Sequence, residues 1–355
     1  MRFVLLMSML WAGPFGQGTA YAQENTNNPS LTDTAKTLAI QLHPQMIGGA
    51  VPIEGSNGGV VFRASAEVGT RGPKHQSHLS VDLLNSAGTP LLRAAEAGYD
   101  RRGKSSRNAY RLRGRWDWIP LPSLKVSLGR DTLHDGWGRR SLFRGRHSAP
   151  VPFVETRLDA GGRLRYRHRI EALQGAASIH CAPNAAGDPR FWVPETGPLR
   201  TNIERMVISH RLEVDMGKRI TAALWGAVVW NTEDGERLFE PHYLLPLTSL
   251  RPTEYAQGSS DNALVGLEGR WRLGPPDRSQ RFLYGQLLLD ELIVSEILGS
   301  TGWWGNKYGL LGGMHWGYPR GAWRVEAAGV RPWTYSHFTP TSAYINGLTP
   351  LAHPL

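Results

Sequence analysis

Residues 262–273 read Asn-Ala-Leu-Val-Gly-Leu-Glu-Gly-Arg-Trp-Arg-Leu, and this stretch decides the fold class. One set of alternate positions is mainly apolar: Ala263, Val265, Leu267, Gly269, Trp271 and Leu273. The other set is more polar: Asn262, Leu264, Gly266, Glu268, Arg270 and Arg272. Because successive side chains of a β-strand point to opposite faces, this pattern predicts a strand with one apolar face and one face in water.

Similar alternation recurs from about residue 58 to residue 331 and predicts roughly a dozen strands, many near the ~10 residues that a tilted membrane strand needs. Besides residues 60–68 and 262–273, the candidate strands are His78–Leu84, Leu91–Tyr99, Asn108–Trp118, Leu124–Arg130, Gly162–Leu173, Ile203–Asp215, Arg219–Trp230, Arg281–Asp290, Tyr308–Trp316 and Ala322–Arg331. Short turns alternate with long connectors such as residues 131–161 and 174–201, which is typical of outer-membrane barrels. The predicted fold is all-β, an antiparallel transmembrane β-barrel of the outer membrane.

Tryptophans near the predicted strand ends support a membrane setting, because aromatic side chains form girdles at the two bilayer surfaces. These residues are Trp116, Trp118, Trp230, Trp271, Trp316 and Trp323. The alternative interpretation is a soluble β-sandwich or propeller with aromatic residues in its core.

The chain divides into three predicted segments. Residues 1–22 have a positive start, a short apolar run and a small-residue cleavage site, which is the pattern of a signal peptide. For residues 23–57 the sequence predicts a linker that contains a short helix at 32–42. Residues 58–355 predict the barrel domain, with a further helical turn at 289–298. No later segment approaches the ~20 apolar residues of a membrane helix, so the exported chain is either periplasmic or a barrel in the outer membrane.

Charge and cysteine content narrow the function classes. The 355 residues carry a formal net charge of +10 and a single cysteine, Cys181, which excludes an intramolecular disulfide. A basic balance favours polyanionic neighbours such as nucleic acid, lipid head groups or an acidic polysaccharide. An exported barrel rarely meets nucleic acid, so we expect the other two.

Two arginine ladders lie in the most basic part of the chain. Residues 100–170 hold 18 lysines and arginines against 6 aspartates and glutamates. Each ladder occupies alternate positions of one predicted strand: Arg111, Arg113 and Arg115 in the first, and Arg163, Arg165, Arg167 and Arg169 in the second. We expect them to face the lumen, because an arginine facing lipid at mid-membrane costs about 2–4 kcal/mol. They form either a basic wall for a polyanion or ion pairs with acids of neighbouring strands in a plugged barrel.

Residues 302–309, Gly-Trp-Trp-Gly-Asn-Lys-Tyr-Gly, form a second candidate site. Trp303 and Trp304 are able to stack on sugar rings while Asn306 hydrogen-bonds to hydroxyl groups. The alternative interpretation is an anchor at the membrane surface or a contact with a plug.

Signals for catalysis or metal binding are weak. The 12 histidines show no metal-ligand spacing, and the sequence has neither a nucleophile elbow nor a phosphate loop. The carboxylate pairs Glu233-Asp234 and Asp290-Glu291 would point to opposite faces of a strand. We therefore expect no enzymatic activity, no cofactor and no metal.

Several blocks occur in a specific order from about residue 125 to the end. They are Leu128-Gly129-Arg130, Asp135-Gly136-Trp137-Gly138 with Ser141-Leu142, the arginine-rich strand near 163–169, Leu250-Arg251-Pro252-Thr253-Glu254-Tyr255, Gly258-Ser259-Ser260-Asp261-Asn262-Ala263-Leu264, Tyr284-Gly285-Gln286 with Leu289-Asp290-Glu291, residues 302–309, Val330-Arg331-Pro332-Trp333-Thr334-Tyr335-Ser336-His337 and Leu351-Ala352-His353-Pro354-Leu355. These blocks resemble the Wzi capsule-assembly family, including its gliding-motility relatives of the RemB type.

The resemblance implies an outer-membrane barrel that anchors surface polysaccharide in a lectin-like way, with no catalytic residues to carry over. Family members look longer at the C-terminus, so we expect C-terminal strands to be missing and the barrel to be incomplete. The implied partners are an acidic capsular or surface polysaccharide, outer-membrane lipid and lipopolysaccharide. Two alternatives stay open: a structural or gliding-motility component that contacts other envelope proteins, and an anion-selective porin.

Overall fold

The structure, a computed structural model, describes residues 2–10, 35–39, 60–87, 100–101, 108–146, 148–174, 179–183, 192–196, 203–231, 243, 261–274, 280–291, 299, 306–318, 321–337, 342–346 and 349–352. These residues form one large sheet and two small ones. The large sheet contains β1 (Arg2–Leu10), β2 (Ala35–Ala39), β3 (Val60–Arg71), β4 (His75–Ala87), β5 (Asp100–Arg101), β6 (Asn108–Leu121), β7 (Leu124–Asp131), β8 (Val151–Ala160), β9 (Leu164–Gln174), β12 (Ile203–Met216), β13 (Ile220–Asn231), β14 (Asn262–Leu273), β15 (Arg281–Glu291), β16 (Lys307–Tyr318) and β17 (Gly321–Val330). The small sheets pair β10 (Ile179–Pro183) with β11 (Trp192–Thr196) and β18 (Ile345–Asn346) with β19 (Thr349–Pro350).

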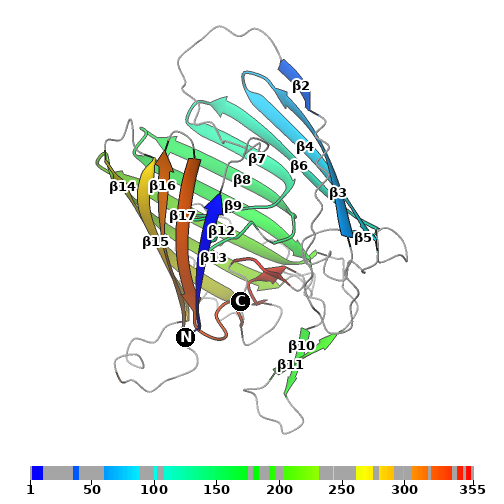
Figure 1. Cartoon of the computed structure of the whole chain (residues 1–355), viewed down its shortest axis with the longest axis vertical. Helices are drawn as coiled ribbons and strands as arrows, with labels where there is room; N and C mark the ends of the chain where they lie inside the picture. Colours follow the sequence, from blue (N-terminus) through cyan, green and yellow to red (C-terminus); the bar gives the residue numbers. More distant parts are fainter. Residues whose placement is uncertain are drawn as a thin grey trace.

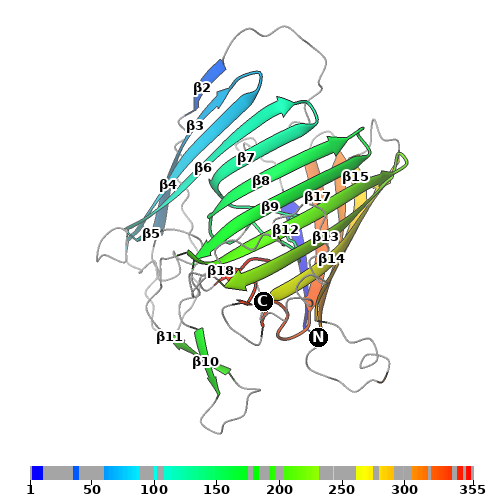
Figure 2. The same ribbon diagram turned by 180° about the vertical axis from the view of Figure 1, so that it is seen from behind.

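The large sheet is an antiparallel meander of 15 strands in the order β1-β17-β16-β15-β14-β13-β12-β9-β8-β7-β6-β4-β3-β2, with β5 beside β6. Figures 1 and 2 show that it curls around a concave side. The strands at the two ends of this order, β1 and β2, do not pair with each other in the part of the chain that the structure describes. The sheet is therefore an unclosed barrel, as the sequence predicts.

The two faces of the sheet have opposite character. The face called the outer face carries large apolar side chains that are exposed: Val68, Leu79, Leu83, Tyr110, Leu112, Trp116, Trp118, Leu128, Val154, Leu158, Leu164, Val214, Leu224, Leu267, Trp271 and Leu310. The inner face carries polar and charged side chains that are buried: Asp82, Asp117, Ser127, Glu155, Arg169, Glu171, Arg211, Thr221, Glu268, Gln286 and Glu326. Apolar groups outside and polar groups inside are typical of a transmembrane barrel. They confirm the predicted fold class.

Connections are short at one end of the strands, here called the short-turn rim. They comprise residues 122–123 between β6 and β7, 161–163 between β8 and β9, and 217–219 between β12 and β13. The strands leave the opposite end through much longer segments, such as residues 132–150. In outer-membrane barrels the short turns face the periplasm and the long loops face the cell exterior.

Aromatic side chains gather on the outer face near the short-turn rim. Trp118 and Trp271 are exposed there, and Trp316 stacks on Trp323 with ring centroids 5.8 Å apart. This arrangement agrees with the predicted girdle. Trp230 does not belong to it, because it is fully buried and packs against Tyr243.

Two predicted elements are wrong. The helix expected at 32–42 is replaced over Ala35–Ala39 by the strand β2, which pairs with β3. A helix this short is marginal in water, so pairing with a strand edge overrides its local preference. The connector expected at 131–161 contains the strand β8. Pro152 and the apolar inner-face residues Val151 and Phe153 disguise its alternation.

Other predicted elements fall partly outside the described residues. The predicted strand Leu91–Tyr99 and most of the predicted helical turn at 289–298 lie there, although Leu289–Glu291 form the end of β15. Residues 2–10, in the predicted signal peptide, form β1 and pair with β17; the signal peptide stays a prediction. Among the described residues, no helix has the length and apolar character needed to cross a bilayer.

If the outer face contacts lipid, a charge placed on it should destabilise the protein more at the centre of the bilayer than near its surface. Leu267→Arg, in the middle of β14, should lower the free energy of unfolding by about 2–4 kcal/mol, because the guanidinium would face the centre of the bilayer. Leu158→Arg, two residues from the end of β8, is the matched control and should cost about 0–1 kcal/mol. Denaturant titration in lipid vesicles measures both. Equal costs would contradict the proposed membrane position of the sheet.

Candidate functional site

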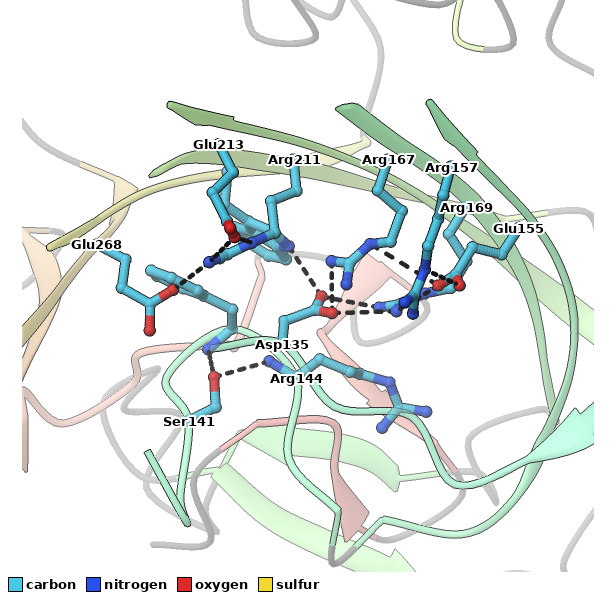
Figure 3. Close-up of polar contacts among 12 residues, drawn as sticks. Asp135, Ser141, Arg144, Glu155, Arg157, Arg167, Arg169, Arg211, Glu213 and Glu268 are labelled. Atoms are coloured by element: carbon cyan, nitrogen blue, oxygen red, sulfur yellow. Dashed lines mark hydrogen bonds and ion pairs between the residues drawn. The ribbon is translucent and has the colours of Figure 1, made fainter. Parts of the chain in front are cut away.

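The long segment between β7 and β8 turns back against the inner face of the sheet. This segment, residues 132–150, is called the inward loop, and Figure 3 shows part of it beneath the strands. Its Leu142, Phe143 and Arg144 have no exposed surface. The backbone N–H of Asp135 donates to the carbonyl of Arg144 at 3.0 Å, so the loop is closed by a bridge of its own.

Asp135 is the central contact between the inward loop and the sheet. Its carboxylate lies 2.5 Å from Arg167 and 2.8 Å from Arg169, which are neighbouring inner-face positions of β9 (Figure 3). The indole N–H of Trp225 on β13 donates to the same carboxylate at 3.1 Å. Burial alone would raise the pKa of Asp135, but the two arginines outweigh it and hold the pKa below its usual value. Asp135 is therefore an ionised, fully buried anchor.

Two further carboxylates complete this buried network. Glu155 on β8 lies 3.3 Å from Arg169, and Glu171 on β9 lies 2.8 Å from the same guanidinium. Glu171 also accepts a hydrogen bond from Arg144 of the inward loop at 2.9 Å. Charges buried in this way need such partners, because an uncompensated ion in a protein interior costs several kcal/mol.

Farther along the inward loop, backbone N–H groups donate to side chains on three other strands. Trp137 donates to Glu268 of β14 at 2.8 Å. Arg139 donates to Glu326 of β17 at 2.6 Å, and Leu142 donates to Gln286 of β15 at 2.8 Å. These bonds satisfy loop backbone groups that are shielded from water. They also fix the loop against strands from widely separated parts of the chain.

Aromatic contacts hold the inward loop from the side. Phe143 stacks on Trp225 with ring centroids 5.0 Å apart and planes 11° apart. This stacking requires a glycine beside it, since a Cβ atom at Gly266 would lie 2.2 Å from the Phe143 ring. Trp137 lies under the guanidinium groups of Arg211 and Arg270, at 5.2 and 4.9 Å from its ring centroid.

Segments near the C-terminus pack against the same loop. The hydroxyl of Tyr335 donates to the carbonyl of Leu142 at 3.0 Å, and the N–H of Gly145 donates to the carbonyl of Leu351 at 2.7 Å. Tyr335 is itself held by Asp290 at the end of β15, through a bond of 2.7 Å from its backbone N–H. Segments from distant parts of the sequence therefore meet at the inward loop.

The ladder arginines with ion pairs lie on the inner face, as expected, and pair with acids of the chain itself. The pairs are Arg111 and Arg113 with Asp82, Arg115 with Asp117 and Glu155, Arg165 with Glu213 and Asp215, and Arg167 and Arg169 with Asp135 and Glu155. Arg163 is exposed in the turn before β9. The ion pairs that the second interpretation requires are therefore present, and a binding role of the ladders stays a prediction.

The second candidate site is only partly within the described residues. Trp303 and Trp304 lie outside them. Asn306 is buried immediately before β16, beside Lys307, whose ammonium group lies 3.8 Å from Asp290. In the described part of the chain, no cluster of three or more His, Cys, Asp or Glu side chains is placed to hold a metal ion.

The sequence interpretation missed the acidic half of the network. Glu155 lies on a strand that the sequence does not predict, whereas Glu268 already lies on the predicted polar face of residues 262–273. The same alternation over residues 322–330 indicates the inner-face position of Glu326.

Membrane-length antiparallel strands, an apolar outer face and a polar, occupied inner face define the class: a transmembrane β-barrel fold of the outer-membrane type. No protein-family model matches this chain, and no curated protein matches it. Among solved structures, OprB of Pseudomonas putida, determined at high pH, is similar at 7% identity, with a TM-score of 0.33, over 81% of this chain and 90% of that one. OccAB1 of Acinetobacter baumannii is similar at 8% identity, with a TM-score of 0.20, over 78% and 92%. Likenesses this distant assign no family, so the class rests on the sheet itself.

Removing the charge of Asp135 should release the inward loop. Asp135→Asn leaves Arg167 and Arg169 buried with too little compensating charge, so we expect the free energy of unfolding to fall by about 3–5 kcal/mol. The matched control is Asp159→Asn, at an exposed position next to the turn at 161–163, with an expected cost of about 0–1 kcal/mol. Denaturant titration of the folded protein measures both. Similar losses for the two variants would show that Asp135 does not anchor the loop.

The stacking of Phe143 predicts a contrast between two glycines of β14. Gly266→Ala should displace the Phe143 ring and expose the inward loop to protease, because its Cβ atom has no room. Gly269→Ala, on the outer face of the same strand, meets no atom within 4 Å and should leave the cleavage rate unchanged. Limited proteolysis followed by mass mapping of residues 132–150 measures the difference. Equal protection of both variants would contradict the packing described.

Proposed function

We propose that this chain is a non-enzymatic outer-membrane protein that binds an acidic surface polysaccharide and has an occupied interior. The observation that carries the proposal is the inward loop, which is attached to β9, β13, β14, β15 and β17 by the contacts of Asp135, Trp137, Arg139 and Leu142. A diffusion channel needs open space where this loop lies. The occupied inner face therefore favours a binding or anchoring role over the anion-selective porin.

The polyanionic partner is supported by charge and by the resemblance to capsule-assembly proteins. The chain carries a net charge of +10, and its cations are concentrated in residues 100–170. Most ladder arginines are engaged with acids, so they would contribute to the local potential more than to direct contacts. The exposed Arg163 and the segment with Trp303 and Trp304 are the candidates for direct contact with sugar. Lipid and lipopolysaccharide would surround the outer face.

Polymer binding tests the proposal directly. Purified protein in detergent should retain fluorescent polygalacturonate, an acidic polysaccharide, and should not retain neutral dextran of similar length. Retention should fall as salt is raised from low to physiological ionic strength, because exposed charges are screened over about 8–10 Å. Equal retention of the two polymers, or of neither, would contradict the proposal.

A conductance measurement separates the alternatives within the same experiment. In planar bilayers the protein should show no steady, open conductance, because the inward loop fills the inner face. A stable, anion-selective conductance would replace the proposal with the porin. Capture of envelope proteins from solubilised membranes, without retention of polygalacturonate, would favour the structural or motility role.

A further inference from the structure

A cavity lies beside the short-turn rim, lined mainly by inner-face residues of β7, β8, β9 and β12, and is called the rim cavity. It has a volume of about 330 Å³ and begins at the turn residues Pro122 and Ser123. Five cationic side chains line it but only two acidic ones, and the cations are Lys125, Arg157, Arg165, Arg167 and Arg211. The volume is at the lower end of the range of about 300–1,000 Å³ for small-molecule sites.

Two of these arginines have donors with no hydrogen-bond partner among the described residues. The side chain of Arg211 is 7% exposed; its Nη2 donates to Glu268 at 2.6 Å, whereas its Nη1 has no hydrogen-bond partner within the described residues. The buried Nε of Arg167 also lacks a hydrogen bond there, and its nearest charged partner is Glu155 at 3.8 Å. Buried polar atoms are nearly always hydrogen-bonded in proteins, and an unsatisfied donor costs about 1–3 kcal/mol. A bound molecule would supply the acceptor that these donors lack among the described residues.

The acids near the cavity are already shared among several arginines. Glu155 lies within 4 Å of Arg115, Arg157, Arg167 and Arg169. A carboxylate offers two oxygen atoms, whereas each guanidinium offers five N–H donors. The side chain of Arg157 is also 48% exposed, so a molecule entering at the rim reaches it. Donors therefore outnumber acceptors around the cavity.

We propose that the rim cavity binds the carboxylate of an acidic sugar residue, which Arg157, Arg167 and Arg211 grip as it enters from the short-turn side. Guanidinium forks bind planar carboxylates through paired, charge-assisted hydrogen bonds. The identity of the ligand as a sugar rests on the proposed function. Because short turns face the periplasm in outer-membrane barrels, the site meets its ligand before the polymer reaches the cell surface.

Calorimetric titration of the full chain with sodium glucuronate tests this site, with glucose as the neutral probe of the same ring size. Arg157→Met and Arg211→Lys should each weaken glucuronate binding by about tenfold or more, since each removes charge-assisted donors. Arg211→Lys keeps the positive charge beside Glu268, so it tests the fork without leaving an unpaired acid. The matched control is Arg219→Met, in the exposed turn at 217–219 of the same rim, which should bind as the native chain does.

The outcomes separate the site from the function. Two results would show that the rim cavity is not the binding site while leaving the proposed function in place. In the first, the protein retains polygalacturonate but does not bind glucuronate. In the second, it retains polygalacturonate and both variants bind glucuronate with full affinity. Failure of both polymer and monosaccharide to bind the native chain overturns both. Tighter binding of inorganic phosphate than of glucuronate at the same arginines overturns the assignment to a carboxylate sugar.

Discussion

The contact on which the structure depends is the buried carboxylate of Asp135 between Arg167 and Arg169. Two neighbouring guanidinium groups on one strand repel each other and lose their hydration when they are covered. Asp135 attracts both, and its place in the inward loop means that the same contact holds the loop against the inner face. Glu171 then pairs with Arg144 of the loop, so a second ion pair joins the sheet to the loop.

This arrangement explains why the inner face is both charged and filled. Acids and amides on β14, β15 and β17 accept hydrogen bonds from the loop backbone. In an open lumen, water would accept these hydrogen bonds. The outer face must instead be apolar, because lipid offers no hydrogen bonds to charged groups. The rim cavity, with its cationic residues, and the exposed Arg163 lie near the short-turn rim.

The strands from β12 to β17 could be predicted because their alternation is long and uninterrupted, as in residues 262–273. Strand β8 could not, since Pro152 is a poor strand residue and the apolar Val151 and Phe153 on its inner face blur the alternation. The helix expected near Ala35–Ala39 depended on a local preference that pairing with β3 overrides. For the arginine ladders the sequence established the shared face, and left open whether their partners were acids of the chain or a polyanion.

The sequence by itself determined which residues form strands and which side chains share a face, because alternation between two faces is a property of a single strand. Only the tertiary structure decided the partners. Trp137 and Glu268 are 131 residues apart, and Arg139 and Glu326 are 187 apart. Their contact depends on how far each strand slides along its neighbour and on the inward course of the loop. Whether two such distant residues meet depends on the registers of all the strand pairs that lie between them. A local sequence pattern does not contain these registers.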